Sequence, residues 1–349
     1  MSTIFYKDKP IIGLDISKIG VKIMSIDKNK MLVRGYGSIG LDPEEADFDN
    51  EQAVTYISEK IKEMLREKIV GRIESNRVAV SIPTRRTFSR TFTLPVKEEK
   101  NIKSAVALEA EQYIPIPVDS LYLDYQVISK NKDEIAVLMC ASPKKIVDDL
   151  LNIAENCGLE IALMEPGINS TARLLTRTEE GALPTVIVDI GPAETDIAIL
   201  DSVIRVTGGL SIGGHTLTLD LANKMNLSAE AAHQFKVLNG LAPGARQAKI
   251  MAALKPSLDK IVTEVKRVNR YYTERFPDEK KLEQVLIVGA GSNVPGLGDF
   301  FTNELMMPSR VASPWQSLKF GTQGKLSKQS RSQYTVAAGL ALIKSEDVR

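Results

Sequence analysis

The stretch IIGLDISKIGVK, residues 11–22, returns in altered form as TVIVDIGPAETD, residues 185–196. Each copy is an apolar run that ends in an aspartate, followed by a tight turn and an alternating strand. A second turn and a third strand ending in glycine come next in both places. The two aspartates, Asp15 and Asp189, lie almost half the chain length apart. A duplication on this scale predicts two similar α/β halves.

The two apolar runs, Ile11–Asp15 and Val186–Asp189, are typical of strands buried on both faces of a sheet. Each run places its aspartate at the carboxyl end of the strand, where ligands bind in open α/β sheets. The small residues of the following turn leave backbone N–H groups that can hold a phosphate. Lys22 lies on the next strand, where its ammonium can point back at the same ligand. The pattern therefore predicts an anion site beside each aspartate.

Composition excludes several classes of protein. Lys and Arg together number 45 against 44 acidic residues in 349, for a net charge of +1, which argues against nucleic-acid binding as the main task. No apolar run approaches the ~18 residues of a membrane helix, so we expect no direct membrane insertion. The first residues contain no signal-peptide core. Cys140 and Cys157 have neither metal-ligand nor disulfide spacing, which fits a reducing, cytoplasmic compartment.

An extra block separates the two copies of the motif. Its order of predicted elements is β-α-β-β-α-β, which is typical of a compact subdomain. We therefore predict an insertion in the first half. The predicted divisions are the first half over 1–86, an inserted partner-binding subdomain over 87–163, a connecting helix within 164–184, the second half over 185–335, and a C-terminal helix over 336–349 that packs back on the first half.

The residues themselves favour an ATP site. Such a site needs carboxylates for Mg²⁺ and backbone amides around the phosphates. Asp15 and Asp189 can supply the carboxylates, one from each half. Gly213-Gly214 opens a predicted helix whose first N–H groups can meet an anion, and residues 289–292 (Gly-Ala-Gly-Ser) permit close backbone approach. Taken singly, each feature also fits an ordinary turn or helix cap. The order of these features along the chain and the duplication of the motif are what favour an ATP site.

With these motifs in place, the chain resembles the actin-like ATPase superfamily. Over its whole length it resembles the PilM family of type IV pilus assembly proteins. The resemblance implies an actin-like α/β fold, a duplicated ribonuclease H-like fold, with an inserted subdomain of the FtsA/PilM type. Within the inserted block, the run from Glu111 to Pro115 (EQYIP) is close to the PilM pattern.

The resemblance also assigns roles to residues. It implies ATP and Mg²⁺ as cofactors, with Asp15 and Asp189 near the metal, and it implies that Glu165 positions water while Asp189 assists catalysis. His233 stands where relatives place a ribose-binding glutamate. Because Ser17, Pro192 and Glu194 also depart from the family pattern, we expect slow hydrolysis or none. The residues implied to contact the nucleotide are Asp15, Ser17, Lys18, Lys22, Asp189, Gly191, Gly213, Gly214, His233, Lys236, Gly289, Ala290, Gly291 and Ser292.

Three functions remain open at this point. The first is a scaffold in which ATP bridges the two halves and which binds the cytoplasmic tail of a PilN-like inner-membrane protein, with pilus assembly ATPases as further candidates. It would be cytoplasmic and would reach the membrane through that partner. The second is an active ATPase or kinase on the same fold, and the third is an FtsA-like filament-forming protein. A basic cluster, Arg85, Arg86 and Arg90, is either a solvated face or a partner site.

Overall fold

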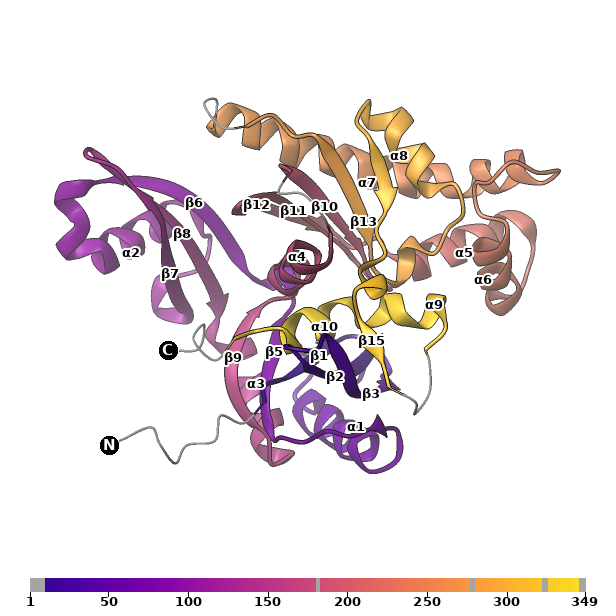
Figure 1. Ribbon diagram of the computed structural model, residues 1–349, viewed down its shortest axis with the longest axis horizontal. Helices are drawn as coiled ribbons and strands as arrows, with labels where there is room; N and C mark the ends of the chain where they lie inside the picture. Colours follow the sequence, from indigo (N-terminus) through magenta and orange to yellow (C-terminus); the bar gives the residue numbers. More distant parts are fainter. Residues whose placement is uncertain (1–9, 180–182, 277–279, 322–325, 345–349) are drawn as a thin grey trace. The chain divides into compact units, whose positions relative to one another are not determined.

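The computed structural model describes residues 10–179, 183–276, 280–321 and 326–344, and the chain divides into two units (Figure 1). Unit 1 consists of Met1–Pro83, Asp148–Glu179 and Pro314–Arg349; unit 2 consists of Thr84–Val147 and Glu180–Ser313. The ends of the predicted first and last divisions, 1–9 and 345–349, lie outside the described residues, as do 180–182 of the connecting segment. Within the described ranges, no helix combines the length and hydropathy needed to cross a bilayer.

Unit 1 is built on a mixed sheet with the strand order β15-β3-β2-β1-β5-β9, and β4 pairs with β3. Its helices are α1, most of α3, α4, α9 and α10. The bounds are β1 Ile12–Ser17, β2 Gly20–Asp27, β3 Leu32–Gly40, α1 Ala53–Glu67, β4 Val70–Gly71, β5 Arg77–Ile82, α3 Lys144–Asn156, β9 Glu160–Pro166, α4 Gly167–Thr178, β15 Lys319–Phe320, α9 Lys328–Arg331 and α10 Thr335–Ala341.

The first copy of the motif forms the centre of this sheet. β1 pairs antiparallel with β2 and parallel with β5, and β2 continues antiparallel into β3. Ile12 and Leu14 of β1 are fully buried. The β1–β2 register sets Asp15 opposite Lys22. Burial of the strand therefore fixes where its terminal aspartate lies.

Close helix packing covers β1. The helix α10 packs against β1, β2 and α4, and Figure 1 shows it beside the centre of this sheet. Two glycines make this approach possible: a Cβ at Gly13 would lie 1.9 Å from the carbonyl oxygen of Ala337, and a Cβ at Gly339 would lie 1.9 Å from that of Ser170. Backbone contacts this close exclude any larger residue.

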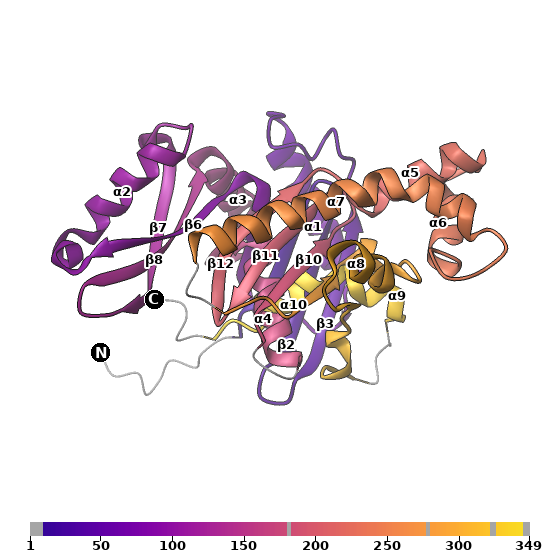
Figure 2. The same cartoon turned by 90° about the horizontal axis from the view of Figure 1, so that it is seen from above.

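Unit 2 is built on a longer mixed sheet with the strand order β14-β13-β10-β11-β12-β6-β8-β7. Figure 2 shows α7 running across the β10–β12 part of this sheet. The bounds are β6 Phe88–Pro95, α2 Ile102–Tyr113, β7 Leu121–Lys130, β8 Glu134–Pro143, β10 Thr185–Ile190, β11 Thr195–Asp201, β12 Val203–Leu210, α5 Gly214–Met225, α6 Ala229–Leu238, α7 Gln247–Arg275, β13 Gln284–Val288, α8 Leu297–Leu305 and β14 Ser309–Val311.

The second copy of the motif has the same arrangement as the first. β10 pairs antiparallel with β11 and parallel with β13, and β11 continues antiparallel into β12. Every residue of β10 is buried. The core beneath it is formed with α5, α7 and α8, through residues such as Leu217, Leu258 and Phe301. The predicted duplication is confirmed at the level of strand pairing.

The inserted block differs from its predicted bounds of 87–163. Its elements occur in the expected order, but the division between the units falls after Val147. The reason is strand pairing: β9 joins β5 in the sheet of unit 1, in parallel, with Ser81 opposite Glu165. The remaining strands β6, β7 and β8 continue the sheet of unit 2, with Val206 of β12 opposite Arg90 of β6.

The second half likewise ends earlier than the predicted residue 335, because unit 2 stops at Ser313. The chain then returns to unit 1, where β15 pairs in parallel with β3. Trp315 and Leu318 are buried there in one cluster with residues of α4 and α10, including Leu174 and Ala338. The pairing of β15 and the burial of Trp315 and Leu318 therefore assign the residues after Ser313 to unit 1.

Substitution of Gly339 by alanine tests the close packing of α10. The added methyl group would overlap the Ser170 carbonyl, so we expect the free energy of unfolding to fall by about 3 kcal/mol. The control is Gly40→Ala, since a Cβ there meets nothing within 4 Å. Urea denaturation of both variants measures the difference, and equal stability would contradict the packing.

Candidate functional site

In unit 1, Asp15 lies near the end of β1, where two neighbouring side chains contact it. The Ser81 hydroxyl donates to Asp15 Oδ1 at 2.8 Å and accepts from the backbone N–H of Ile16 at 3.2 Å. Lys22 Nζ lies 3.7 Å from Asp15 Oδ2. Ser81 and Lys22 are both buried. The carboxylate is therefore oriented by β5 and partly neutralised by β2.

Ser17 and Lys18, the other predicted residues of this turn, contact different groups. The Ser17 hydroxyl donates to the Gly20 carbonyl at 2.8 Å and accepts from Lys22 Nζ at 3.2 Å. Lys18 is exposed and pairs with Asp47. The structure thus brings Asp15, Ser17 and Lys22 together, whereas Lys18 is bound to a different acidic group.

Glu165, the residue implied to position water, lies at the end of β9 and is engaged by one arginine. Arg173 NH1 donates to Glu165 Oε1 at 2.5 Å, and Arg173 NH2 donates to Oε2 at 2.7 Å. Arg173 also donates to the Gly339 carbonyl at 3.2 Å. Paired, charge-assisted bonds of this kind are strong. Both carboxylate oxygens of Glu165 therefore have a cationic partner within unit 1.

In unit 2, Asp189 is buried at the end of β10, beside a glycine corner. Gly289 follows β13 with φ of +88°, a conformation that favours glycine. A Cβ at this position would lie 2.3 Å from Asp189 Oδ1. Ala290, Gly291 and Ser292 then form a single 3₁₀ turn, and the Ser292 hydroxyl donates back to the Gly289 carbonyl at 2.7 Å. The predicted residues 289–292 thus lie against Asp189.

The hairpin of unit 2 carries an acidic pair where unit 1 carries an ion pair. The β10–β11 register sets Asp189 opposite Asp196, and Asp196 Oδ1 is buried with no hydrogen-bond partner in the described part of the chain. Burial, Glu194 and Asp189 raise the pKa of Asp196 well above its usual range, while Thr84 and Arg85 act in the opposite direction. Like charges directly opposite each other are destabilising, so this hairpin favours a bound proton or a cation.

The start of α5 donates its amides within the chain. The N–H of Gly214 donates to the Gly191 carbonyl at 2.8 Å, and the N–H of His215 donates to the Pro192 carbonyl at 2.8 Å. These two N–H groups therefore already have acceptors within the chain, and the expectation that this glycine corner meets an anion stays a prediction. Gly213 and Gly214 instead permit close contact: a Cβ at Gly214 would lie 2.8 Å from Gly291 Cα.

Lys236 is the buried cation of this region. It projects from α6 and donates to the Gly214 carbonyl and, at 2.7 Å, to the Thr218 hydroxyl. Only 3% of it is exposed, and burial lowers the pKa of its ammonium to about 8. Burial, and then the charge of Lys236, lowers the pKa of His233. Gly214 links Lys236 to Gly291, and His233 lies on α6 one turn before Lys236.

The sequence interpretation missed Ser81, Arg173 and Thr218. Each contacts a predicted residue: Asp15, Glu165 and Lys236, respectively. Serine and threonine within an apolar strand or helix are common, and nothing in the local pattern marks these two. The spacing of Arg173 from Glu165 becomes informative only once β9 is known to continue into α4.

The arrangement fits Mg²⁺ bound together with phosphate better than a metal held by protein alone. Within the described ranges, no group of three or more His, Cys, Asp or Glu residues is placed to hold a metal. Asp196 Oδ1, buried and lacking a hydrogen-bond partner there, is the kind of atom that an ion or its water would satisfy. Phosphate oxygens and water would have to complete the coordination.

Burial of Lys236 makes the free energy of unfolding depend on pH. The charged ammonium is less favourable in the folded protein than in the unfolded chain, which lowers the free energy of unfolding. This destabilisation is complete below about pH 8 and disappears as the pH approaches the unfolded pKa of about 10.4. The Lys236→Met variant lacks this group. We expect wild type to gain about 2–3 kcal/mol relative to the variant between about pH 7 and pH 10. Chemical denaturation across this range measures it; a constant difference would contradict the burial of a charged Lys236.

Comparison with known proteins identifies the family. The model of the family described as type IV pilus assembly protein PilM matches residues 13–345. The cell division protein FtsA of Neisseria meningitidis serogroup B is 25% identical over 274 residues, which are 67% of this chain and 64% of FtsA. The chain thus spans slightly less than two thirds of that relative.

Solved structures show the same fold. A structure titled PilM–PilN type IV pilus biogenesis complex matches with a TM-score of 0.79 and 22% identity, over 97% of this chain and 99% of that one. MreB5 of Spiroplasma citri, bound to ADP, matches with a TM-score of 0.54 and 14% identity, over 95% of each chain. The fold is therefore actin-like, and the chain belongs to the PilM family of type IV pilus assembly proteins.

Proposed function

We propose that this protein is an ATP-binding scaffold of the type IV pilus assembly machinery, which binds the cytoplasmic tail of a PilN-like inner-membrane protein. The observation that carries the proposal is the family match over residues 13–345 together with the fold shared with the PilM–PilN complex. On this proposal the protein acts in the cytoplasm and is held at the inner membrane by its partner. Pilus assembly ATPases are further candidate partners.

The nucleotide would contact residues from both units. Unit 1 offers Asp15, oriented by Ser81, and Lys22 for a phosphate. Unit 2 offers the corner at Gly289–Ser292, the acidic pair of its hairpin, and Lys236. Mg²⁺ would reduce the repulsion between carboxylates and phosphates, the chemistry that such an ion supplies. That MreB5 binds ADP on the same fold supports this assignment.

Slow turnover is part of the proposal. Glu165 is the group that the family resemblance implies for positioning water, and Arg173 engages both of its oxygens. A general base must reach the proton that it removes. A carboxylate with both oxygens bound to a guanidinium is poorly placed for that task. This contact favours a scaffold over an active ATPase or kinase.

The inserted strands offer an edge for a peptide. β7 ends the strand order of its sheet, so the described part of unit 2 places no strand beyond it. Tyr122 and Val127 on this strand are each 46% exposed, and Leu108 on α2 is 59% exposed. An extended peptide can add to such an edge through main-chain hydrogen bonds, with side chains adding specificity. We assign the PilN-like tail to this edge.

Replacement of Ser81 tests the nucleotide site. Ser81→Ala removes the hydroxyl that orients Asp15, so we expect ATP with Mg²⁺ to bind about fivefold more weakly. The control is Ser58→Ala, a buried serine of α1 whose hydroxyl donates to Val54 in its own helix. Isothermal titration calorimetry measures both. Equal affinities for wild type, Ser81→Ala and Asp15→Asn would overturn the assignment.

Replacement of Tyr122 tests the peptide edge. Truncating an exposed aromatic anchor to alanine should weaken binding of a labelled peptide from a PilN N-terminal segment about tenfold. Fluorescence polarisation measures the affinity. Leu151→Ala on α3 is the matched control, since Leu151 is 44% exposed and lies outside β6–β8. Equal loss in both variants, or none in either, would place the peptide elsewhere.

A further inference from the structure

Two carboxylates of unit 1 lie at the same edge of its sheet. The parallel strands β1, β5 and β9 are neighbours, with Leu14 opposite Val80 and Ser81 opposite Glu165. The Ser81 hydroxyl donates to Asp15, so Asp15 and Glu165 lie on either side of Ser81. At about 4.8 Å per strand, their backbones are about 10 Å apart. Glu165 therefore borders the edge at which an ATP phosphate would contact Asp15.

Asp15 and Glu165 also point to the same face of the sheet. A Cβ at Gly13 would lie 1.9 Å from the Ala337 carbonyl oxygen of α10. Side chains two residues apart in a strand share a face, so Asp15 points to the side that α10 covers. Glu165 contacts Arg173 of α4, and α4 packs against α10. The two carboxylates therefore lie on one side of the sheet.

Arg173 holds Glu165 and α10 at once. Its guanidinium donates to Glu165 Oε1 at 2.5 Å and to Oε2 at 2.7 Å, and NH1 also donates to the Gly339 carbonyl at 3.2 Å. The side chain of Arg173 is 22% exposed and that of Glu165 is 10% exposed. Bonds with a charged partner are strong, and burial strengthens them further. To turn an oxygen toward a ligand at Asp15, Glu165 has to give up one of these bonds.

We propose that Arg173 is a positioning residue that restrains Glu165 and thereby limits ATP hydrolysis. The inference rests on the proposed function, because it requires ATP at Asp15. In the hydrolysis step, a water oxygen bonds to the γ-phosphorus, and the bond from that phosphorus to the oxygen shared with the β-phosphate breaks. ADP leaves with that oxygen, and the proton lost from the water passes through the Glu165 carboxylate to solvent. Slow turnover is then the effect of one removable side chain and not of the fold.

Replacing Arg173 tests the restraint, with phosphate release from the full chain measured at steady state in ATP and Mg²⁺. Arg173→Gln leaves both oxygens of Glu165 without their cationic partner. We expect kcat to rise at least about tenfold, because a general base that reaches its proton contributes about 10²–10⁴-fold. The KM for ATP should stay the same, because Arg173 is not among the predicted ATP contacts. A purely structural arginine would change stability and would not raise kcat at constant KM.

Two further variants assign the effect to Glu165. Arg173→Lys keeps the positive charge but lacks the planar fork that pairs with both carboxylate oxygens, so we expect a kcat between those of wild type and Arg173→Gln. The gain should disappear in the double variant Glu165→Gln/Arg173→Gln, which has no carboxylate to release.

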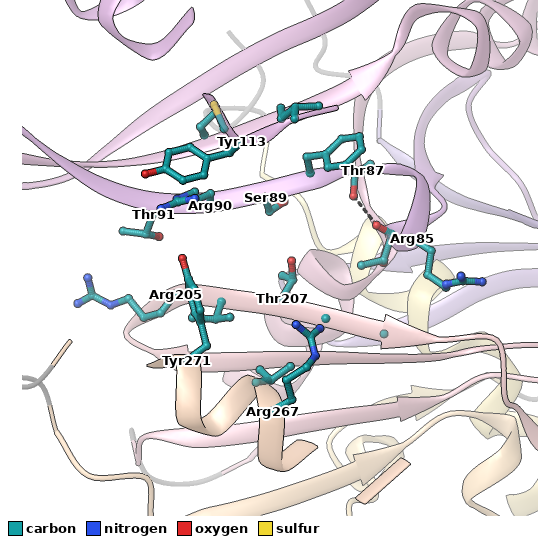
Figure 3. A pocket seen from close by; sticks show the side chains of 18 residues that line it. Arg85, Thr87, Ser89, Arg90, Thr91, Tyr113, Arg205, Thr207, Arg267 and Tyr271 are labelled. Carbon is teal, nitrogen blue, oxygen red and sulfur yellow. Dashed lines mark hydrogen bonds between the residues drawn. The ribbon is translucent and has the colours of Figure 1, made fainter. Parts of the chain in front are cut away.

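The matched control breaks a similar ion pair in unit 2. Arg267 of α7 donates to Glu264 through bonds of 2.5 and 2.8 Å. Arg267 lines a cavity of about 460 Å³ whose described lining contains none of the predicted nucleotide residues, and Figure 3 shows it pointing into that cavity. Arg267→Gln should therefore leave kcat and KM at their wild-type values.

Calorimetry with ATP separates failure of this inference from failure of the proposed function. If ATP binds and Arg173→Gln turns over no faster than wild type, the inference is wrong and the proposed function stands. A gain that persists in the double variant also contradicts the inference, because Glu165 is then not the group released. No heat of ATP binding to wild type would overturn both. If circular dichroism shows that Arg173→Gln does not fold, Arg173→Lys decides by the same criterion, a kcat above wild type at constant KM.

Discussion

Burial of one central strand on both faces, in each unit, is the constraint on which the rest of the structure depends. β1 and β10 are each flanked by an antiparallel and a parallel neighbour, and their apolar residues are buried. Such a strand cannot place a carboxylate along its length without burying an unpaired charge. Asp15 and Asp189 therefore lie near the carboxyl ends of their strands, beyond most of the apolar residues.

The two hairpins share a backbone arrangement and differ in charge. In unit 1 the residue opposite the aspartate is Lys22, and in unit 2 it is Asp196. The first hairpin is thereby partly neutral on its own, whereas the second holds a carboxyl whose pKa is raised. A magnesium-bound nucleotide would suit this asymmetry, since the lysine can meet a phosphate and the acidic pair can meet the metal.

Much of the fold was predictable because its signals are local. Each apolar run ends in its own aspartate, and the glycine corner at 289–292 is a run of consecutive residues, so each signal can be recognised within a few positions of sequence. The domain boundaries were not predictable, because they depend on which distant strand β9 and β15 join. The same holds for Ser81, which faces Asp15 across parallel strands, and for the amides of α5, whose acceptors come from the loop at Gly191.

We propose that one nucleotide contacts both duplicated hairpins. Hydrogen–deuterium exchange of the full chain, with and without ATP and Mg²⁺, tests it most directly, because amide exchange slows where a ligand restrains the backbone. We expect slower exchange in both Gly13–Ser17 and Gly289–Ser292 on addition of the nucleotide. Protection confined to one of these segments, or absent from both, would contradict it.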